Sequence, residues 1–109
     1  MEHYDIVVIG SGSGNTILDE EFADRRAAII DSGTFGGTCL NVGCIPTKMF
    51  VLPADLATSP SEAAKLGVRL QFRGASFTSI RDRIFGRIDP ISRSGLEYRQ
   101  GLENIDVYT

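Results

Sequence analysis

Cys39 and Cys44 are the residues of this chain whose type and spacing are best suited to chemistry, and they are its only thiols. They stand five positions apart in GTFGGTCLNVGCIPTK, residues 33–48. On a regular helix their Cα atoms would lie about 8.7 Å apart, whereas a disulfide tolerates no more than about 7 Å. If the thiols bridge, the helix must be distorted between them, and Gly43 with Pro46 offers the place. A distorted ring is easier to reduce than a relaxed one, so such a bridge would suit reversible redox chemistry.

The same pair leaves other interpretations open. A C-x4-C pair can supply half of a metal site, although His3 is the only imidazole and there is no second cysteine pair. Two inert buried thiols are the simplest alternative. The preceding GTFGGT leads to a predicted helix amino terminus, where the local positive field favours a thiolate.

A second candidate site is a glycine-rich turn. Gly10 and Gly12 match the first two glycines of G-x-G-x-x-G, the pattern that lets a pyrophosphate approach bare backbone at a helix amino terminus. Asp31 follows Gly10 by 21 positions, where an acid can accept hydrogen bonds from ribose hydroxyls. Asn15 occupies the third glycine position, and we expect Gly14 beside it to take part of that role. The alternative is an ordinary glycine turn with a surface aspartate.

These candidates require a strand, helix and strand in order. The runs YDIVVIG and AAIID predict parallel strands at residues 4–9 and 27–31, the first buried on both faces, joined by a helix within residues 11–26. A right-handed crossover would then place the glycines at the carboxyl edge of the sheet. This order predicts an α/β fold.

The rest of the chain is predicted to be mainly helical. We expect a helix over residues 39–57 with Pro46 near its start, in which Pro53 either kinks the helix or limits its pairing. Further expectations are a polar joint with one helical turn at 58–67, a short strand at 68–72, a helix within 77–102 interrupted at Gly86 and Pro90, and a closing strand at 105–109.

Composition narrows the class of protein. With 109 residues, 42% hydrophobic and 23% charged, the chain suits one small globular domain. A net charge of −3 with scattered basic residues argues against nucleic-acid partners. The longest apolar run, residues 6–9, is too short for a membrane span, and the start MEHYD lacks a basic secretory signal. We therefore expect a cytoplasmic protein, in which a cysteine pair serves catalysis, redox change or metal binding rather than structure.

Taken together, GGTCLNVGCIPTK and GSGSGN resemble the pyridine nucleotide-disulfide oxidoreductases. The resemblance covers nearly the whole chain and is strongest over residues 4–52 and 85–108. It implies a Rossmann-like FAD/NAD(P)-binding domain with a parallel central sheet, incomplete at its carboxy-terminal side. Residues 1–109 would be the amino-terminal part of that FAD-binding domain, without the NADPH and dimer-interface domains.

The resemblance also implies a role for each thiol. Electrons would pass from NADPH through FAD to a Cys39–Cys44 disulfide, and from the dithiol to a small-molecule disulfide. Cys39 would be the interchange thiol, Cys44 the charge-transfer thiolate against the flavin, and Lys48 would lie near the flavin's reactive nitrogen; a solvated helix lysine is the alternative for Lys48. The implied cofactor-binding residues are Gly10, Gly12, Ser13, Gly14, Asp31, Ser32, Gly36, Gly37, Thr38, Cys39 and Lys48.

Several parts of such an enzyme are not in these residues. Family members form homodimers in which the interface domain supplies a His–Glu acid-base pair, and His3 sits in the wrong place to substitute. We therefore expect this segment alone to be inactive. Lipoamide dehydrogenase and mercuric reductase share GGTCLNVGC, so they remain rival members, and a non-catalytic nucleotide-binding or thiol-switch module remains an alternative of another class.

Overall fold

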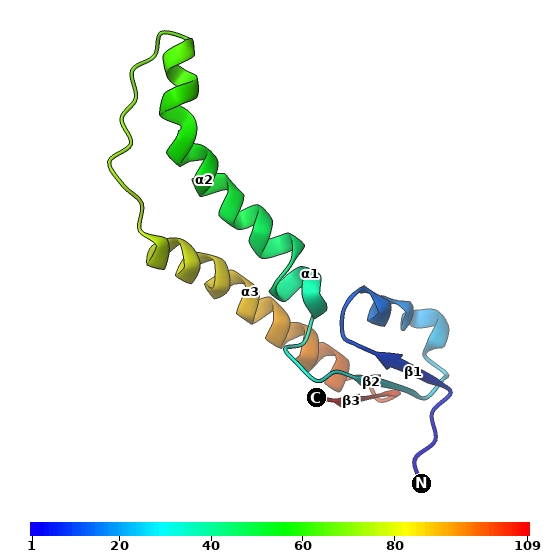
Figure 1. Ribbon diagram of the computed structural model, residues 1–109. Coiled ribbons are helices and arrows are strands. Elements are labelled where there is room, and N and C mark those ends of the chain that lie inside the picture. Colours follow the sequence, from blue (N-terminus) through cyan, green and yellow to red (C-terminus); the bar gives the residue numbers. More distant parts are fainter.

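The computed structural model describes all 109 residues, and a small parallel sheet forms one end of the molecule (Figure 1). The strands are β1 (Ile6–Ile9), β2 (Ala27–Ile30) and β3 (Ile105–Tyr108), in the order β1-β2-β3. Ile6 pairs with Ala27, which in turn pairs with Ile105 on its other side. The predicted adjacent parallel strands and the predicted closing strand are confirmed.

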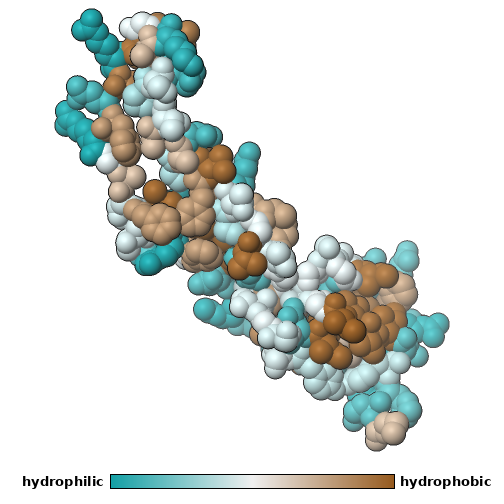
Figure 2. Space-filling model, in the orientation of Figure 1, coloured by the Kyte–Doolittle hydropathy of each residue, from teal (hydrophilic) through white to brown (hydrophobic).

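The two faces of this sheet are not equally covered. Ala27, Ala28 and Ile29 of the central strand are at most 1% exposed. In contrast, Val7 and Ile9 of β1 are 50% and 88% exposed, and Figure 2 shows an apolar patch over this end of the molecule. The prediction that the first strand is buried on both faces is therefore wrong for β1.

The hydrophobic core lies between the other face of the sheet and the carboxy-terminal half of a long helix, α3 (Phe77–Gln100). Its fully buried members are Leu18, Ala27, Ile29, Phe35 and Ile105, and Leu96 of α3 packs against them. This core fixes the carboxyl edge of the sheet relative to the loops that follow the strands.

The connection between β1 and β2 differs from the prediction. Instead of an α-helix it contains two short 3-10 helices, η1 (Ser13–Ile17) and η2 (Glu20–Phe22). Side chains compete with helix formation here: the Asn15 amide donates to the Ser11 and Gly12 carbonyls, and the Asp19 carboxylate caps the backbone N–H of Glu21. The predicted helix within 11–26 is thus wrong.

The remaining helices form an elongated hairpin. A short α1 (Gly37–Asn41) is followed by α2 (Cys44–Lys65), which runs beside α3 and away from the sheet, giving extents of 69 × 25 × 18 Å (Figure 1). Pro46 lies in the first turn of α2 as predicted, because its missing N–H is not needed there. None of the helices is long and apolar enough to cross a membrane.

Three predictions for this hairpin are wrong. Residues 58–65, expected in a polar joint, continue α2, and residues 68–72, expected as a strand, have no regular structure. Helix α3 runs without interruption through Gly86 and Pro90. Ile84 and Ile88 are buried one turn apart on its inner face, and this packing holds the helix together across both residues.

Candidate functional site

The glycine turn after β1 borders a cleft of about 530 Å³ at the carboxyl edge of β1 and β2. This volume is in the range of small-molecule and cofactor sites. Only two of its lining residues are hydrophobic. The lining consists of Ile9, Gly10, Ser11, Gly12, Ser13, Gly14, Asp31, Thr34, Gly37, Thr38, Asn41 and Val42. Of the cofactor-binding residues expected from the sequence, seven line this cleft, whereas Ser32, Gly36, Cys39 and Lys48 do not.

Bare backbone from two glycine segments meets in this cleft. Gly37 has φ +74°, and a Cβ there would overlap the Gly12 Cα and lie 2.9 Å from the Gly12 nitrogen. Gly10 has φ +93° with open space around its Cα. A Cβ at Gly14 would meet only Val8, at 3.9 Å, so the expected close-packing role of Gly14 is not seen. The demand for glycine in this cleft falls on Gly10 and Gly37, which both have a positive φ.

Ser11 joins the two glycine segments to Asp31. Its backbone N–H donates to Asp31 Oδ2 at 2.8 Å, its hydroxyl donates to the same oxygen, and its Oγ accepts the Gly36 N–H at 2.8 Å. Ser11 is buried, and sequence reasoning missed it. The available signal was its place between the two glycines of the motif.

Asp31 has a structural task besides any role in binding. Its Oδ1 accepts the Gly33 N–H at 2.9 Å. The hydrogen bonds from the Ser11 hydroxyl, the Ser11 N–H and the Gly33 N–H hold the pKa of the Asp31 carboxyl below its usual value. Three of the roughly four acceptor positions of the carboxylate are therefore occupied, which leaves room for one further donor such as a ribose hydroxyl.

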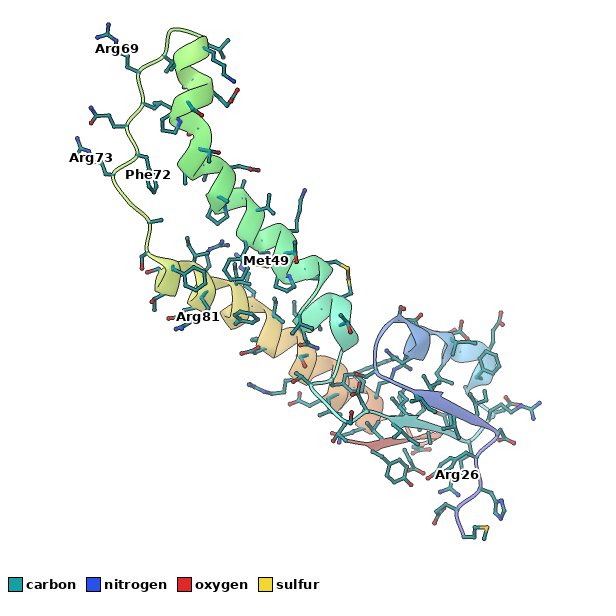
Figure 3. The ribbon with its side chains drawn as sticks, viewed as in Figure 1. Arg26, Met49, Arg69, Phe72, Arg73 and Arg81 are labelled. Carbon is teal, nitrogen blue, oxygen red and sulfur yellow. A yellow bond between two sulfur atoms is a disulfide. The ribbon has the colours of Figure 1, made fainter.

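Cys39 and Cys44 form a disulfide at the junction of α1 and α2 (Figure 3). The helix breaks between them at Val42 and Gly43, which brings the two Cα atoms within 4.7 Å. A Cβ at Gly43 would lie 2.8 Å from the Thr38 carbonyl oxygen, so only glycine permits this approach. The predicted distortion at Gly43 is confirmed. Both cysteines are exposed, which argues against inert buried thiols.

An apolar hollow of about 600 Å³ continues from the cleft along α2. Asn41 and Val42 line both, and Pro46, Phe50 and Phe85 line the apolar part. A polar cleft over glycine backbone that adjoins an apolar hollow fits a dinucleotide that carries a planar ring, such as FAD. Lys48 is exposed one helical turn after Cys44 and lines neither hollow.

Arg99 is a second residue that sequence reasoning missed. Its guanidinium donates to Asn15 Oδ1 at 2.9 Å, to the Asn15 carbonyl at 2.7 Å and to the Leu18 carbonyl at 2.7 Å. It is only 8% exposed. Asn15, which departs from the glycine pattern, is thus the link between Arg99 and the glycine turn. Sequence spacing gave no signal for a contact 84 positions apart.

Known structures place this arrangement in the class of flavoprotein disulfide reductases. The HOCl-induced flavoprotein disulfide reductase RclA of Escherichia coli, in its Cu(II) complex, matches with a TM-score of 0.74 and 28% identity, over 99% of this chain and 22% of that one. No family model matches the chain.

Curated relatives agree, and the chain belongs to the pyridine nucleotide-disulfide oxidoreductases. Mycothione reductase of Mycobacterium tuberculosis H37Rv is 56% identical over 108 residues, which cover 99% of this chain and 24% of the relative. Dihydrolipoyl dehydrogenase of Bacillus subtilis 168 is 30% identical over 97% of this chain and 23% of the relative. The chain spans about a quarter of the length of the curated relatives it matches.

Proposed function

We propose that the protein containing this chain is an FAD-dependent, NADPH-linked disulfide reductase that reduces mycothione, the disulfide of mycothiol. The observation that carries the chemistry is the exposed Cys39–Cys44 disulfide beside a cleft floored by glycine backbone. The choice of substrate rests on the 56% identity to mycothione reductase, against 30% to dihydrolipoyl dehydrogenase of B. subtilis.

The cleft would hold FAD through groups that this chain provides. Backbone at Gly10, Gly12, Ser13 and Gly14 would face the pyrophosphate, and the free acceptor position of Asp31 would bind the adenosine ribose. Ser32, Gly36, Gly37, Thr38, Cys39 and Lys48 are proposed as further FAD contacts, of which Gly37 and Thr38 line the cleft in this chain. Bound FAD would supply the two-electron relay between NADPH and the disulfide. The NADPH site itself would lie outside these residues.

The thiols would act in two exchange steps. The Cys39 thiolate attacks one sulfur of the substrate disulfide, forms a mixed disulfide and releases one mycothiol. Cys44 then attacks Cys39 Sγ, which releases the second mycothiol and restores the Cys39–Cys44 disulfide. The dithiol loses two electrons and the substrate gains them, with both protons ending on the released thiols. Cys39 is assigned as the interchange thiol and Cys44 as the one that faces the flavin.

The proposal includes a cytoplasmic homodimer. A thiol pair that cycles between dithiol and disulfide suits a reducing compartment. The acid-base His–Glu pair that the resemblance implies would come from residues outside this chain, across the dimer.

Assays of the purified complete gene product test the proposal. We expect bound flavin and NADPH oxidation that depends on mycothione, with glutathione disulfide, lipoamide and Hg²⁺ as comparison substrates. Reduction of NAD⁺ by dihydrolipoamide would instead identify a lipoamide dehydrogenase, and Hg²⁺-dependent NADPH oxidation a mercuric reductase. A protein without flavin or NADPH oxidation would support the non-catalytic module.

A further inference from the structure

The glycine turn of this chain lacks the helix that usually follows it. In the dinucleotide motif the unpaired N–H groups and the dipole of an α-helix attract the phosphates. Here the turn leads into η1, a 3-10 helix of five residues that is followed by a second short one. So short an element provides little macrodipole, and a phosphate in the cleft needs another source of positive potential.

Arg99 is a buried positive charge directly behind the turn. Its three hydrogen bonds go to neutral oxygens, and no carboxylate lies within 4.0 Å of its guanidinium. It is 8% exposed within this chain alone, so any further part of the protein has little of its surface left to contact. Since a buried charge is costly unless an opposite charge compensates it, Arg99 lacks a counter-charge among these residues.

Arg99 also lies close to the proposed phosphate site. It lines a cavity of about 390 Å³ together with Ser11, Gly12 and Ser13 of the glycine turn. Asn15 connects the two, because its amide donates to the Ser11 carbonyl at 2.9 Å and to the Gly12 carbonyl at 2.6 Å while its Oδ1 accepts from Arg99. These bonds draw the turn's carbonyl oxygens toward Asn15, and hydrogen bonds in such a chain polarise one another.

We propose that Arg99, acting through Asn15, supplies the positive field for a diphosphate that a helix amino terminus supplies in the usual motif. Arg99 is then a positioning residue rather than a direct ligand, and the group that it favours is the diphosphate of a dinucleotide. Asn15 is the adaptation that couples this charge to the turn. The inference rests on the proposed function in taking FAD as the natural ligand.

Ligand binding to the flavin-free complete gene product tests this inference. ADP and adenosine are titrated by calorimetry into wild type, Arg99→Met, Arg99→Lys and Arg87→Met, an exposed arginine of the same helix as the control. We expect Arg99→Met to weaken ADP binding about tenfold and to leave adenosine binding unchanged. Arg99→Lys keeps the positive charge but lacks the planar guanidinium, and its affinity for ADP should lie within about threefold of that of wild type. Arg87→Met should match wild type.

A purely structural role for Arg99 gives a different pattern. ADP and adenosine would then weaken together in Arg99→Met, or Arg99→Lys would lose as much ADP affinity as Arg99→Met, and either result overturns the inference. If Arg99→Met does not fold, Arg99→Lys decides alone: a retained preference for ADP over adenosine supports the inference, and a lost one refutes it. The two proposals can also fail separately. If ADP binding depends on Arg99 as expected but the wild-type protein takes up no FAD, the proposed function is refuted and the inference stands.

Discussion

The two cysteines have unequal surroundings. Cys39 lies in the five-residue α1 directly after Thr38, which lines the polar cleft. Cys44 is the first residue of the 22-residue α2, and Pro46, two positions later, lines the apolar hollow. The field at the amino terminus of the longer helix favours negative charge on the Cys44 sulfur.

Serine variants of the two thiols in the complete gene product should therefore differ in kind. Cys39→Ser leaves the Cys44 thiolate able to donate charge to oxidised flavin, so a long-wavelength absorption band should persist while disulfide reduction stops. Cys44→Ser should lose the band but retain a thiol that forms a mixed disulfide with substrate. Visible spectra recorded at alkaline pH check this, and a band that survives only in Cys44→Ser would show that the roles are reversed.

The Asp31 carboxylate should make stability depend on pH in a defined direction. Its folded-state pKa lies below the unfolded value of about 3.9, so it stabilises the fold above that pH, and the contribution is lost as pH falls through the folded pKa. We expect Asp31→Asn to lower the free energy of unfolding by about 1 kcal/mol at pH 7, and the difference from wild type to shrink at about pH 3.

Thermal melts of the complete gene product at both pH values measure this effect. Asp55→Asn is the matched control, since Asp55 is an exposed aspartate of α2 that makes no side-chain ion pair. An equal loss of stability in Asp31→Asn at both pH values would contradict the assignment of the Ser11 and Gly33 bonds to the charged form.

Among the elements, the contact between the two glycine segments is the least tolerant of change. We expect Gly37→Ala to cost about 2–3 kcal/mol of stability and to strip flavin from the complete gene product, because its Cβ would overlap Gly12 backbone at a positive φ. Gly95→Ala in α3 is the control, since its Cβ would meet the Phe35 ring at an ordinary 3.5 Å. Flavin content and melting temperature are measured for both variants. If Gly37→Ala loses no more flavin or stability than Gly95→Ala, the contact between the glycine segments is not important.

Local patterns predicted the three strands of the sheet and the helix break, but also a strand at residues 68–72 that the structure does not contain. Short β-branched runs gave all three strands of the sheet, and the limit on disulfide spacing gave the distortion at Gly43. Both are properties of a few neighbouring residues. The glycines and Asp31 of the cleft were predictable for the same reason.

Features that depend on distant residues could not be predicted. Pro90 and Gly86 lower helix propensity, yet α3 continues because Ile84 and Ile88 are buried against other elements. The Arg99–Asn15 contact joins residues 84 positions apart, and no spacing rule indicates it. One local feature was missed as well. The helix expected after β1 is absent because the Asn15 and Asp19 side chains form hydrogen bonds to nearby backbone, and apolar spacing does not indicate such bonds.

At the scale of the whole molecule, this segment is extended and sparsely buried. Its radius of gyration is 20.3 Å, whereas a compact domain of this length has about 13 Å. Only 12 of the 109 residues are buried, and apolar side chains are exposed on β1 and along the hairpin, as Figure 2 shows. Because so few side chains are buried, the segment gains little hydrophobic stabilisation to offset the conformational entropy that its chain loses on folding.

The isolated 109-residue chain should therefore bind FAD weakly or not at all and unfold without a sharp transition. Gel filtration of purified segment with added FAD, followed at a flavin wavelength, measures the binding, and circular dichroism measures the transition. The complete gene product is the control. A segment that elutes yellow with stoichiometric flavin would contradict the prediction.

The pairing of β2 with β3 also sets an order for biosynthesis. Ala27 pairs with Ile105, so 78 positions of chain must emerge before the central strand acquires its second neighbour. At bacterial elongation rates of roughly 5–20 residues per second, that interval lasts about 4–16 s. The α2–α3 hairpin lies wholly within this interval and can assemble during this time, while the N–H and C=O groups on one edge of β2 remain unpaired. Nascent chains stalled between residues 31 and 104 would thus expose a strand with an unpaired edge to the chaperones at the ribosome exit.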